Sequence, residues 1–231
     1  IDKTKFAISM EETRYYLNGI YVHKHNKKLI SVATDGHRLA RTSIDLPSGA
    51  DLISGVIIPR KAIYEIRKLI EDYSHDEQVS ISLSDSKIRV KISNTVITSK
   101  LIDGNFPDYE KVIPTDNSNI VKLDCLVFSE SVDRVSTIFS DKSRSVRISL
   151  SKNTLSLEAN SPDTGSASEE IEITYDKDDI SIGFNSRYLL DVTSQIGSGD
   201  LNMALKDAGS PALISLPGDT ESLFVLMPMR V

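Results

Sequence analysis

What the chain lacks excludes several classes of protein. Its one cysteine, Cys125, has no partner for an internal disulfide, so we expect a reducing compartment such as the cytoplasm. No apolar run approaches the roughly 20 residues that span a bilayer. No signal peptide or lipidation motif is visible either. We therefore expect a cytoplasmic protein without a membrane partner, in which Cys125 is a small apolar core residue.

Motifs for common chemistry are also missing from the sequence. It has no phosphate-binding Walker loop, dinucleotide fingerprint or nucleophile elbow. The four histidines do not follow the spacing of a zinc site, so no metal and no cofactor are expected. One short stretch, Asp35-Gly36-His37-Arg38, places a carboxylate near an imidazole. It indicates either an acid/base pair of a β-rich hydrolase, which needs a nucleophile or metal nearby, or a glycine turn capped by the aspartate.

The composition is that of an ordinary globular protein, but its charge is unevenly divided. Of 231 residues, 39% are hydrophobic and 26% are charged. Residues 1–113 carry 17 Lys and Arg against 15 Asp and Glu, a net charge of +2, and residues 114–231 carry 10 against 18, a net of −8, which together give −6. Classical DNA-binding domains are usually basic. Any contact with nucleic acid is therefore expected to be local, loose or topological.

An internal duplication with an offset of about 126 to 130 residues predicts two domains, 1–113 and 114–231. In the first half, strands at 15–23 and 29–34 are followed by an amphipathic helix at 62–70. The second half repeats this with strands at 146–150 and 155–159 and a helix at 188–196, capped by Asn185 or Ser186. Each half also begins with a candidate helix, 3–11 or 129–140, and ends in three strands. The predicted class is α+β, with two helices packed against antiparallel sheets in each domain.

The last nine residues are unusual because they are apolar to the end of the chain. Free ends are usually polar and frayed. Pro228 cannot donate a hydrogen bond to a ladder, so strand pairing is expected to weaken there. Met227 and Met229 flank this proline with the flexible side chains that promiscuous peptide grooves favour. The preferred interpretation of this C-terminal segment is an edge strand, and the second interpretation is an exposed contact surface.

Six separated motifs resemble one family in order along the whole chain. They are TRYYLNG at 13–19, ATDGHRLA at 33–40, IPRK at 58–61, TSKLIDGNFPDY at 98–109, GFN at 183–185 and VLMPMRV at 225–231. All six are similar to segments of the bacterial β sliding clamps, the processivity subunit of DNA polymerase III. The similarity covers only the middle and C-terminal domains of that family. Because the chain also opens on Ile1 without an initiator methionine, we expect it to be a fragment.

The resemblance implies a noncatalytic function. Clamps of this family have three domains of one fold in each chain, and two chains close into a homodimeric ring around duplex DNA without reading its sequence. Short linear motifs of the replicative polymerase, the clamp loader and repair proteins bind a hydrophobic pocket beside the junction of the two matched domains. The dimer surface of the family corresponds to Thr137, Ile138 and an adjacent edge strand. The alternative interpretation is a peptide-binding scaffold unrelated to DNA.

The resemblance also implies the site residues. For DNA binding they are Arg14, Tyr15 and Tyr16. Four cations on the helix near residue 65 are further candidates, although an ordinary solvated helix face explains them equally well: Arg60, Lys61, Arg67 and Lys68. For peptide binding they are Leu17, Thr34, Gly36, His37, Arg38, Leu39, Pro107, Lys111, Val112, Asn185, Tyr188, Pro211, Val225, Leu226, Met227, Pro228, Met229, Arg230 and Val231.

Overall fold

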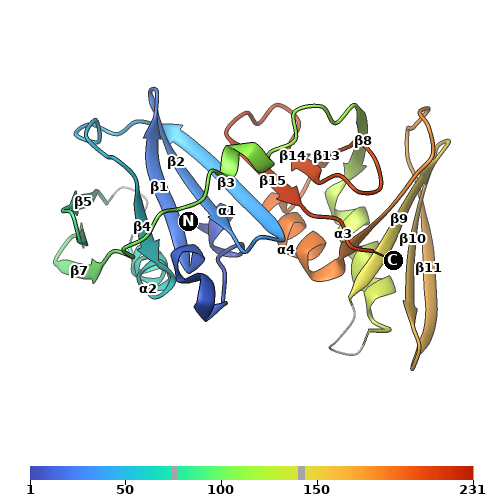
Figure 1. Ribbon diagram of the computed structural model, residues 1–231, viewed down its shortest axis with the longest axis horizontal. Coiled ribbons are helices and arrows are strands. Elements are labelled where there is room, and N and C mark those ends of the chain that lie inside the picture. The colour runs from blue at the N-terminus through green and yellow to red at the C-terminus, as the bar shows by residue number, and fades with distance from the viewer. Residues whose placement is uncertain (74–76, 140–143, 231) are drawn as a thin grey trace. The chain divides into compact units, whose positions relative to one another are not determined.

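Alternating apolar and polar residues form short antiparallel strands throughout the computed structural model, which describes residues 1–73, 77–139 and 144–230 (Figure 1). The chain divides into two compact units: unit 1 is Ile1–Tyr109 and unit 2 is Glu110–Val231. This division lies four residues before the expected boundary between residues 113 and 114. No helix among the described residues is long and apolar enough to cross a membrane.

Unit 1 combines two antiparallel layers with one long helix. Its strands β4, β1, β2 and β3 are hydrogen-bonded neighbours in that order, and β5, β6 and β7 form a second sheet. The helical segments are α1 (Asp2–Lys5), η1 (Glu12–Leu17) and α2 (Arg60–Glu71); η2 (Tyr109–Val112) begins at the last residue of unit 1 and continues into unit 2. The strands are β1 (Gly19–His25), β2 (Lys28–Thr34), β3 (Arg38–Asp45), β4 (Val56–Pro59), β5 (Val79–Leu83), β6 (Lys87–Ile92) and β7 (Thr95–Lys100).

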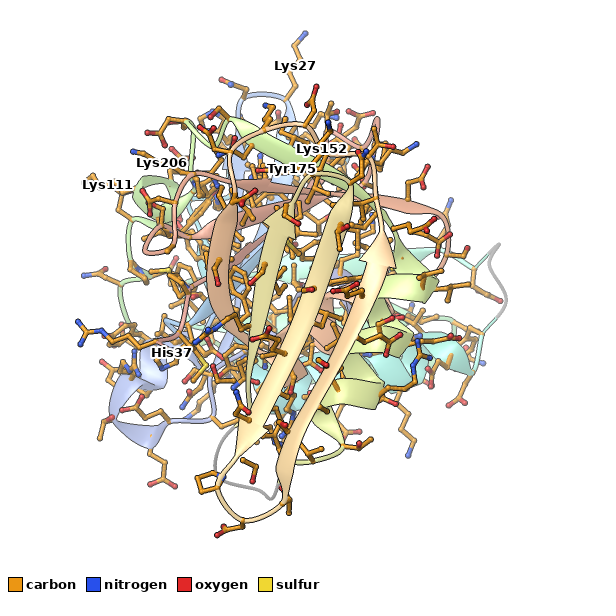
Figure 2. All side chains as sticks on the ribbon, turned by 90° about the vertical axis from the view of Figure 1, so that its right-hand side faces the viewer. Lys27, His37, Lys111, Lys152, Tyr175 and Lys206 are labelled. Atoms are coloured by element: carbon orange, nitrogen blue, oxygen red, sulfur yellow. The ribbon has the colours of Figure 1, made fainter. Side chains whose placement is uncertain are left out.

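Unit 2 repeats this arrangement with a longer first helix. Strands β15, β14, β13 and β8 are neighbours in that order, and β11, β10, β9 and β12 form the other sheet, which faces the viewer in Figure 2. The helices are α3 (Cys125–Ser136) and α4 (Ser186–Ile196). The strands are β8 (Asn119–Asp124), β9 (Ser145–Ser151), β10 (Thr154–Ser161), β11 (Gly165–Glu172), β12 (Ile180–Asn185), β13 (Asp200–Leu205), β14 (Ala212–Ser215) and β15 (Ser222–Leu226). The predicted α+β class with two tandem copies is confirmed.

The helices α2 and α4 confirm the predictions from the sequence. In α2 the buried residues recur every three or four positions, which turns one apolar stripe toward the core: Ala62, Ile63, Ile66 and Leu69. In α4 the side-chain oxygen of Asn185 accepts a hydrogen bond from the backbone N–H of Arg187 at 3.0 Å, so Asn185 is the N-cap. Cys125 is fully buried, as expected for a core residue.

The beginnings of both units differ from the sequence predictions. The helix expected at 3–11 ends at Lys5, and the strand expected from residue 15 begins only at Gly19. Residues 12–17 form a 3₁₀ segment instead, closed by a hydrogen bond from the N–H of Asn18 to the carbonyl of Tyr15. The helix expected at 129–140 begins at Cys125, because the carboxylate of Asp124 caps it by accepting the N–H of Val127 at 2.9 Å. The end of that prediction, residue 140, lies outside the described residues.

Three strands were missed by the sequence analysis because their patterns are weak. β11 has the sequence GSASEEIE, which carries little apolar character, yet it pairs with β10 over eight residues from Thr154↔Glu172 to Ser161↔Gly165. β3 and β8 are the other two missed strands, and each pairs antiparallel with a neighbour. β11 lies at the edge of its sheet, in the order β11-β10-β9-β12. Its pairing is therefore set by β10 more than by its own sequence.

The C-terminal segment is a strand, as predicted. β15 ends at Leu226, two residues before Pro228, and Phe224, Val225 and Leu226 are almost completely buried. The ladder stops where the missing N–H of proline would interrupt it. This apolar end therefore completes the core of unit 2.

Gly19 is a position where the fold leaves no room for a side chain. A Cβ atom at Gly19 would overlap the carbonyl oxygen of Ile58, because β1 and β4 pair closely there with Gly19 opposite Pro59. We expect Gly19→Ala to lower the free energy of unfolding by about 1–3 kcal/mol, measured by urea denaturation. Gly209→Ala is the matched control, because its Cβ would make only an ordinary contact with Asp207. Equal stability of the two variants would contradict the close approach of β1 and β4.

Candidate functional site

The turn that follows β2 in unit 1 is held by its own side chains. The hydroxyl of Thr34 donates to the carbonyl of Arg38 at 2.7 Å and accepts the N–H of Gly36 at 3.1 Å. One carboxylate oxygen of Asp35 accepts the N–H groups of His37 at 2.9 Å and of Arg38 at 3.0 Å. This is the capped glycine turn that the sequence analysis offered as one of its two interpretations.

Arg38 is fixed by partners on two sides. Its Nε donates to the second carboxylate oxygen of Asp35 at 3.1 Å, and its guanidinium carbon lies 5.3 Å from the centre of the Phe6 ring. Only 10% of the Arg38 side chain and 15% of the Asp35 side chain are exposed. A guanidinium that is both ion-paired and stacked on an aromatic ring keeps its direction. Arg38 is therefore a pre-positioned donor rather than a mobile surface cation.

The geometry of Asp35 does not suit the hydrolase interpretation. The hydrogen bond between Asp35 and His37 comes from the backbone N–H of His37, not from its imidazole. The carboxylate meanwhile accepts bonds from two backbone amides and from Arg38. A general acid/base pair requires the imidazole itself within hydrogen-bond reach of the carboxylate or of a nucleophile. His37 is exposed at the surface (Figure 2).

Gly36 brings this turn against Arg14. Its φ is +89°, and a Cβ built there would lie 2.7 Å from Nη1 of Arg14. Arg14 is held by Glu11, whose Oε2 accepts from the Nε of Arg14 at 2.7 Å. Hydrogen bonds from Thr13 and from Arg14 lower the pKa of Glu11. The predicted DNA-binding residue Arg14 and the predicted peptide-binding residue Gly36 are therefore neighbours within unit 1.

The two tyrosines predicted for DNA binding differ in exposure. Tyr15 is 53% exposed, while Tyr16 is partly buried, and their rings meet edge to face with centroids 5.8 Å apart. The segment at Gly104 approaches both tyrosines, because a Cβ at Gly104 would lie 3.1 Å from the Cβ of Tyr16 and 3.4 Å from Cε2 of Tyr15. Tyr15 thus presents most of the aromatic surface that is open to a ligand.

The cations of α2 are not equivalent. Arg67 is bound between two carboxylates, with its Nε 2.7 Å from Asp2 and its Nη1 2.7 Å from Glu71. These partners raise the pKa of Arg67, with the hydrogen bond to Asp2 as the main cause. Lys61 and Lys68 lie on the exposed face of the helix. Of this group, Arg67 is therefore the least suited to a phosphate, since its charge is already compensated.

In unit 1 the remaining predicted peptide-binding residues divide into core and surface. Leu17 and Leu39 are almost completely buried, at 4% and 2% exposure, so they support the surface from beneath rather than forming its outer wall. Pro107 is exposed in the segment that precedes η2. Sequence analysis did not identify Asp35 as the residue that orients Arg38, although its spacing of three from Arg38 is a visible signal.

In unit 2 the C-terminal residues are pinned to another sheet of the same unit. After β15 ends, the N–H of Met229 donates to the carbonyl of Gly183 in β12 at 2.8 Å, in an isolated antiparallel bridge. Asn185 and Tyr188 follow directly, at the end of β12 and in the first turn of α4. Met229 is 40% exposed, whereas Val225 and Leu226 are buried. Val231 lies outside the described residues.

Three predicted residues of unit 2 share a hollow of about 250 Å³: Lys111, Val112 and Pro211. Its wall also contains Asn117, whose amide nitrogen donates to the carbonyls of Ala204 at 2.8 Å and Pro211 at 2.9 Å. Lys206, which lies on the same side as Lys111 in Figure 2, forms an ion pair with Asp116 at 2.7 Å. Sequence analysis missed Asn117, because a single polar residue in a polar linker carries no pattern.

Thr137 and Ile138, predicted for a dimer surface, lie at the end of α3. The hydroxyl of Thr137 donates to the carbonyl of Arg134 at 2.7 Å, and the hydroxyl of Thr164 bonds to the carbonyl of Ile138. The adjacent strand β11 is an edge strand in the order β11-β10-β9-β12. Glu169 ties this edge to α3 by an ion pair with Arg134 at 2.6 Å, and the hydrogen bonds from Arg134 and Ser131 lower the pKa of Glu169.

Comparison with known proteins identifies the family of both units. Residues 1–108 match the model of the DNA polymerase III beta subunit, central domain, and residues 110–230 match the model of its C-terminal domain. The chain is 49% identical over 235 residues to the beta sliding clamp of Caulobacter vibrioides. That alignment covers 100% of this chain and 63% of the relative, so the chain spans less than two thirds of its length.

Solved structures agree with this assignment. A sliding clamp from Bartonella birtlesii, bound to griselimycin, superposes with a TM-score of 0.96 at 50% identity and covers 100% of this chain and 62% of its own. The C. crescentus beta sliding clamp with bound PEG also has a TM-score of 0.96, at 49% identity and with the same coverage of both chains. The chain belongs to the DNA polymerase III beta subunit family, the sliding clamps, of which it represents the central and C-terminal domains.

Proposed function

We propose that this chain is the partner-binding part of a DNA polymerase processivity factor. In the whole protein, a homodimeric ring would encircle duplex DNA, and the chain would tether the replicative polymerase, the clamp loader and repair proteins by short linear motifs. The function is noncatalytic: a polymerase that is tethered to the ring slides along DNA instead of dissociating from it. Family membership supports the proposal, and the chain covers 63% of the length of its Caulobacter vibrioides relative.

The observation that carries the peptide-binding proposal is the pinned C-terminal segment of unit 2. The hydrogen bond from Met229 to Gly183 holds the tail in place after β15 has ended. The methionine side chains on either side of Pro228 are partly open to solvent. An ordered apolar segment loses less conformational entropy on binding than a frayed one. A peptide with apolar anchors would therefore find a prepared surface there.

Each unit has a polar group at a fixed position that would orient a peptide backbone. In unit 1 the Arg38 guanidinium is held by Asp35 and Phe6, and in unit 2 Asn185 caps α4. Peptide sites combine apolar walls with a small number of placed polar groups. We expect an affinity of about micromolar, which suits rapid exchange of partners.

DNA contact is proposed to be weak and independent of sequence. Arg14 and Tyr15 would meet phosphates and unstacked bases, since an exposed aromatic ring stacks on any base. Phosphate contacts of this kind weaken as salt rises. Retention on DNA would come from the closed ring rather than from affinity. The net charge of −6 is consistent with weak affinity for DNA and with retention by the ring.

A scaffold that binds peptides but never DNA is the second candidate. The acidic composition favours it over a classical DNA-binding domain. Loading of the full-length parent onto primed circular DNA separates the two, because a scaffold unrelated to DNA would bind the same peptides without being loaded.

Met229→Ala should weaken peptide binding. We expect the wild-type chain to bind a fluorescent peptide carrying a polymerase clamp-binding motif, and the variant to bind it about 5- to 10-fold more weakly, because apolar contact area is lost. Fluorescence anisotropy measures both affinities. Met10→Ala is the matched control, since Met10 is 75% exposed and outside the predicted site. Equal affinity of the Met229→Ala and wild-type chains, with melting temperatures unchanged, would contradict the proposed surface.

Asp35→Ala should release Arg38. The change removes a largely buried acceptor of three hydrogen bonds, so we expect the free energy of unfolding to fall by about 1–3 kcal/mol in urea denaturation. Peptide affinity should fall with it, and a double-mutant cycle with Arg38→Ala should show coupling of about 0.5 kcal/mol or more. The control is Asp45→Ala, whose carboxylate pairs with Lys28 but is 94% exposed, and it should change stability by less than about 0.5 kcal/mol. Additive effects of the two changes at 35 and 38 would show that Asp35 does not position Arg38.

Tyr15→Ala should weaken binding of single-stranded DNA at low salt. Loss of one stacking platform is worth about 1–3 kcal/mol, so we expect at least about a fivefold loss in affinity, measured by anisotropy of a labelled oligonucleotide. Leu52→Ala, at a side chain that is 95% exposed, is the control for a general surface effect. If both variants bind DNA as the wild type does, Tyr15 has no part in DNA contact.

A further inference from the structure

Three aromatic rings are stacked in series on one face of β1 in unit 1. Tyr21 and His23 occupy alternate positions of this strand, so their side chains share a face. The centroid of the Tyr21 ring is 4.9 Å from that of His23, at an interplanar angle of 23°, and 4.8 Å from that of Phe106, at 8°. A Cβ at Gly55 would lie 2.4 Å from the hydroxyl oxygen of Tyr21. Tyr21 is therefore confined by two rings and at its tip.

The segment that provides Phe106 returns to the same strand through Tyr109. The rings of His23 and Tyr109 are 5.7 Å apart and tilted by 55°, so they are not stacked. Instead, Nε2 of His23 lies 2.9 Å from the hydroxyl oxygen of Tyr109. Tyr109 is only 5% exposed, and a buried phenol usually requires a hydrogen-bond partner. Phe106 and Tyr109 thus attach one short segment to β1 at two points.

The hydrogen bonds of the His23 ring fix its tautomer. Nδ1 lies 3.2 Å from the carbonyl oxygen of Lys24, which can only accept a hydrogen bond. Nδ1 of the neutral ring therefore carries the proton, and Nε2 accepts the hydrogen bond that the hydroxyl of Tyr109 donates. Because both nitrogens are used, the ring holds the Tyr109 hydroxyl in one direction.

Pro107 lies between the two attachment points. It is exposed, and it is among the residues predicted to bind peptides. Upstream, the segment is anchored to β4, because the N–H of Ile102 donates to the carbonyl of Ile57 at 2.9 Å. An exposed proline between fixed neighbours is a rigid apolar contact that loses little conformational entropy on binding. The position of Pro107 therefore depends on how firmly Phe106 and Tyr109 are held.

We propose that His23 is a positioning residue of the peptide site. Its hydrogen bond to Tyr109 holds one end of the segment 106–109 and so places Pro107 for contact with an apolar side chain of the peptide. His23 itself would not touch the peptide. This role rests on the proposed peptide-binding function, and it adds to the site a residue outside the set that the resemblance implies.

Peptide affinities of variants at positions 23 and 109 test this role. The probe is the fluorescent peptide that carries a polymerase clamp-binding motif, and anisotropy measures its dissociation constant. We expect His23→Ala to weaken binding about 3- to 10-fold, because a directional hydrogen bond to the segment is lost. Tyr109→Phe removes a single oxygen atom and should weaken binding by a similar factor. The double variant should lose no more than His23→Ala alone, because both changes break the same bond.

Two further variants separate positioning from packing. His23→Gln places an amide near the former position of Nε2, so it should restore binding to within about twofold of the wild type. His25→Ala is the matched control, because His25 is an exposed histidine two residues further along β1, and its loss should leave the affinity unchanged. The melting temperature of each variant verifies that it is folded.

The outcomes separate the role of His23 from the function on which it rests. A wild-type chain that does not bind the peptide would remove the proposed function, and the role of His23 with it. If the wild type binds, and folded His23→Ala or Tyr109→Phe binds equally well, only the role of His23 is overturned. Equal weakening by His23→Ala and His23→Gln would also overturn it, because the shape of the ring and not its hydrogen bond would then matter.

Discussion

Hydrogen bonding between antiparallel strands is the constraint on which the rest of this structure depends. Each strand has two edges, and every edge must be paired, covered or left open. In unit 2, β8 and β13 pair along the whole of β8, from Asp200↔Asp124 to Leu205↔Asn119, and the apolar side chains on one face of this pair, Val121, Leu123, Leu201 and Met203, are buried. In unit 1, among the described residues, no strand is hydrogen-bonded to the outer edge of β5, and Val79 and Ile81 of β5 are exposed.

The candidate peptide-binding residues use the same principle on a smaller scale. Buried backbone groups need partners, and here those partners also fix the positions of functional side chains. Asp35 satisfies two amides of a tight turn and with its other oxygen directs Arg38. The N–H of Met229 donates to the carbonyl of Gly183 in β12, and this hydrogen bond holds the apolar C-terminal segment in place. Pre-organisation of this kind reduces the cost of binding a flexible peptide.

Much of the fold could be predicted from the sequence, and the failures have physical causes. The helix α2 and the cap Asn185 were predictable because periodicity and capping are local signals. The strand β11 was not, because its sequence GSASEEIE carries little apolar character, and the strands β3 and β8 were also missed. The segment 12–17 became 3₁₀ instead of strand, which alternation of side chains alone does not reveal. For the site, the resemblance supplied the residues, but the role of Asp35 in holding Arg38 required the geometry.

The most direct test of the central claim, that this chain presents an ordered peptide-binding surface, is a hydrogen-exchange footprint of the chain with and without a polymerase clamp-binding peptide. The account predicts slower exchange in two stretches, 34–39 in unit 1 and 225–230 in unit 2, with the helix α3 and the strands β5–β7 unchanged. Saturating peptide that protects neither stretch, or that protects a different surface, would contradict it.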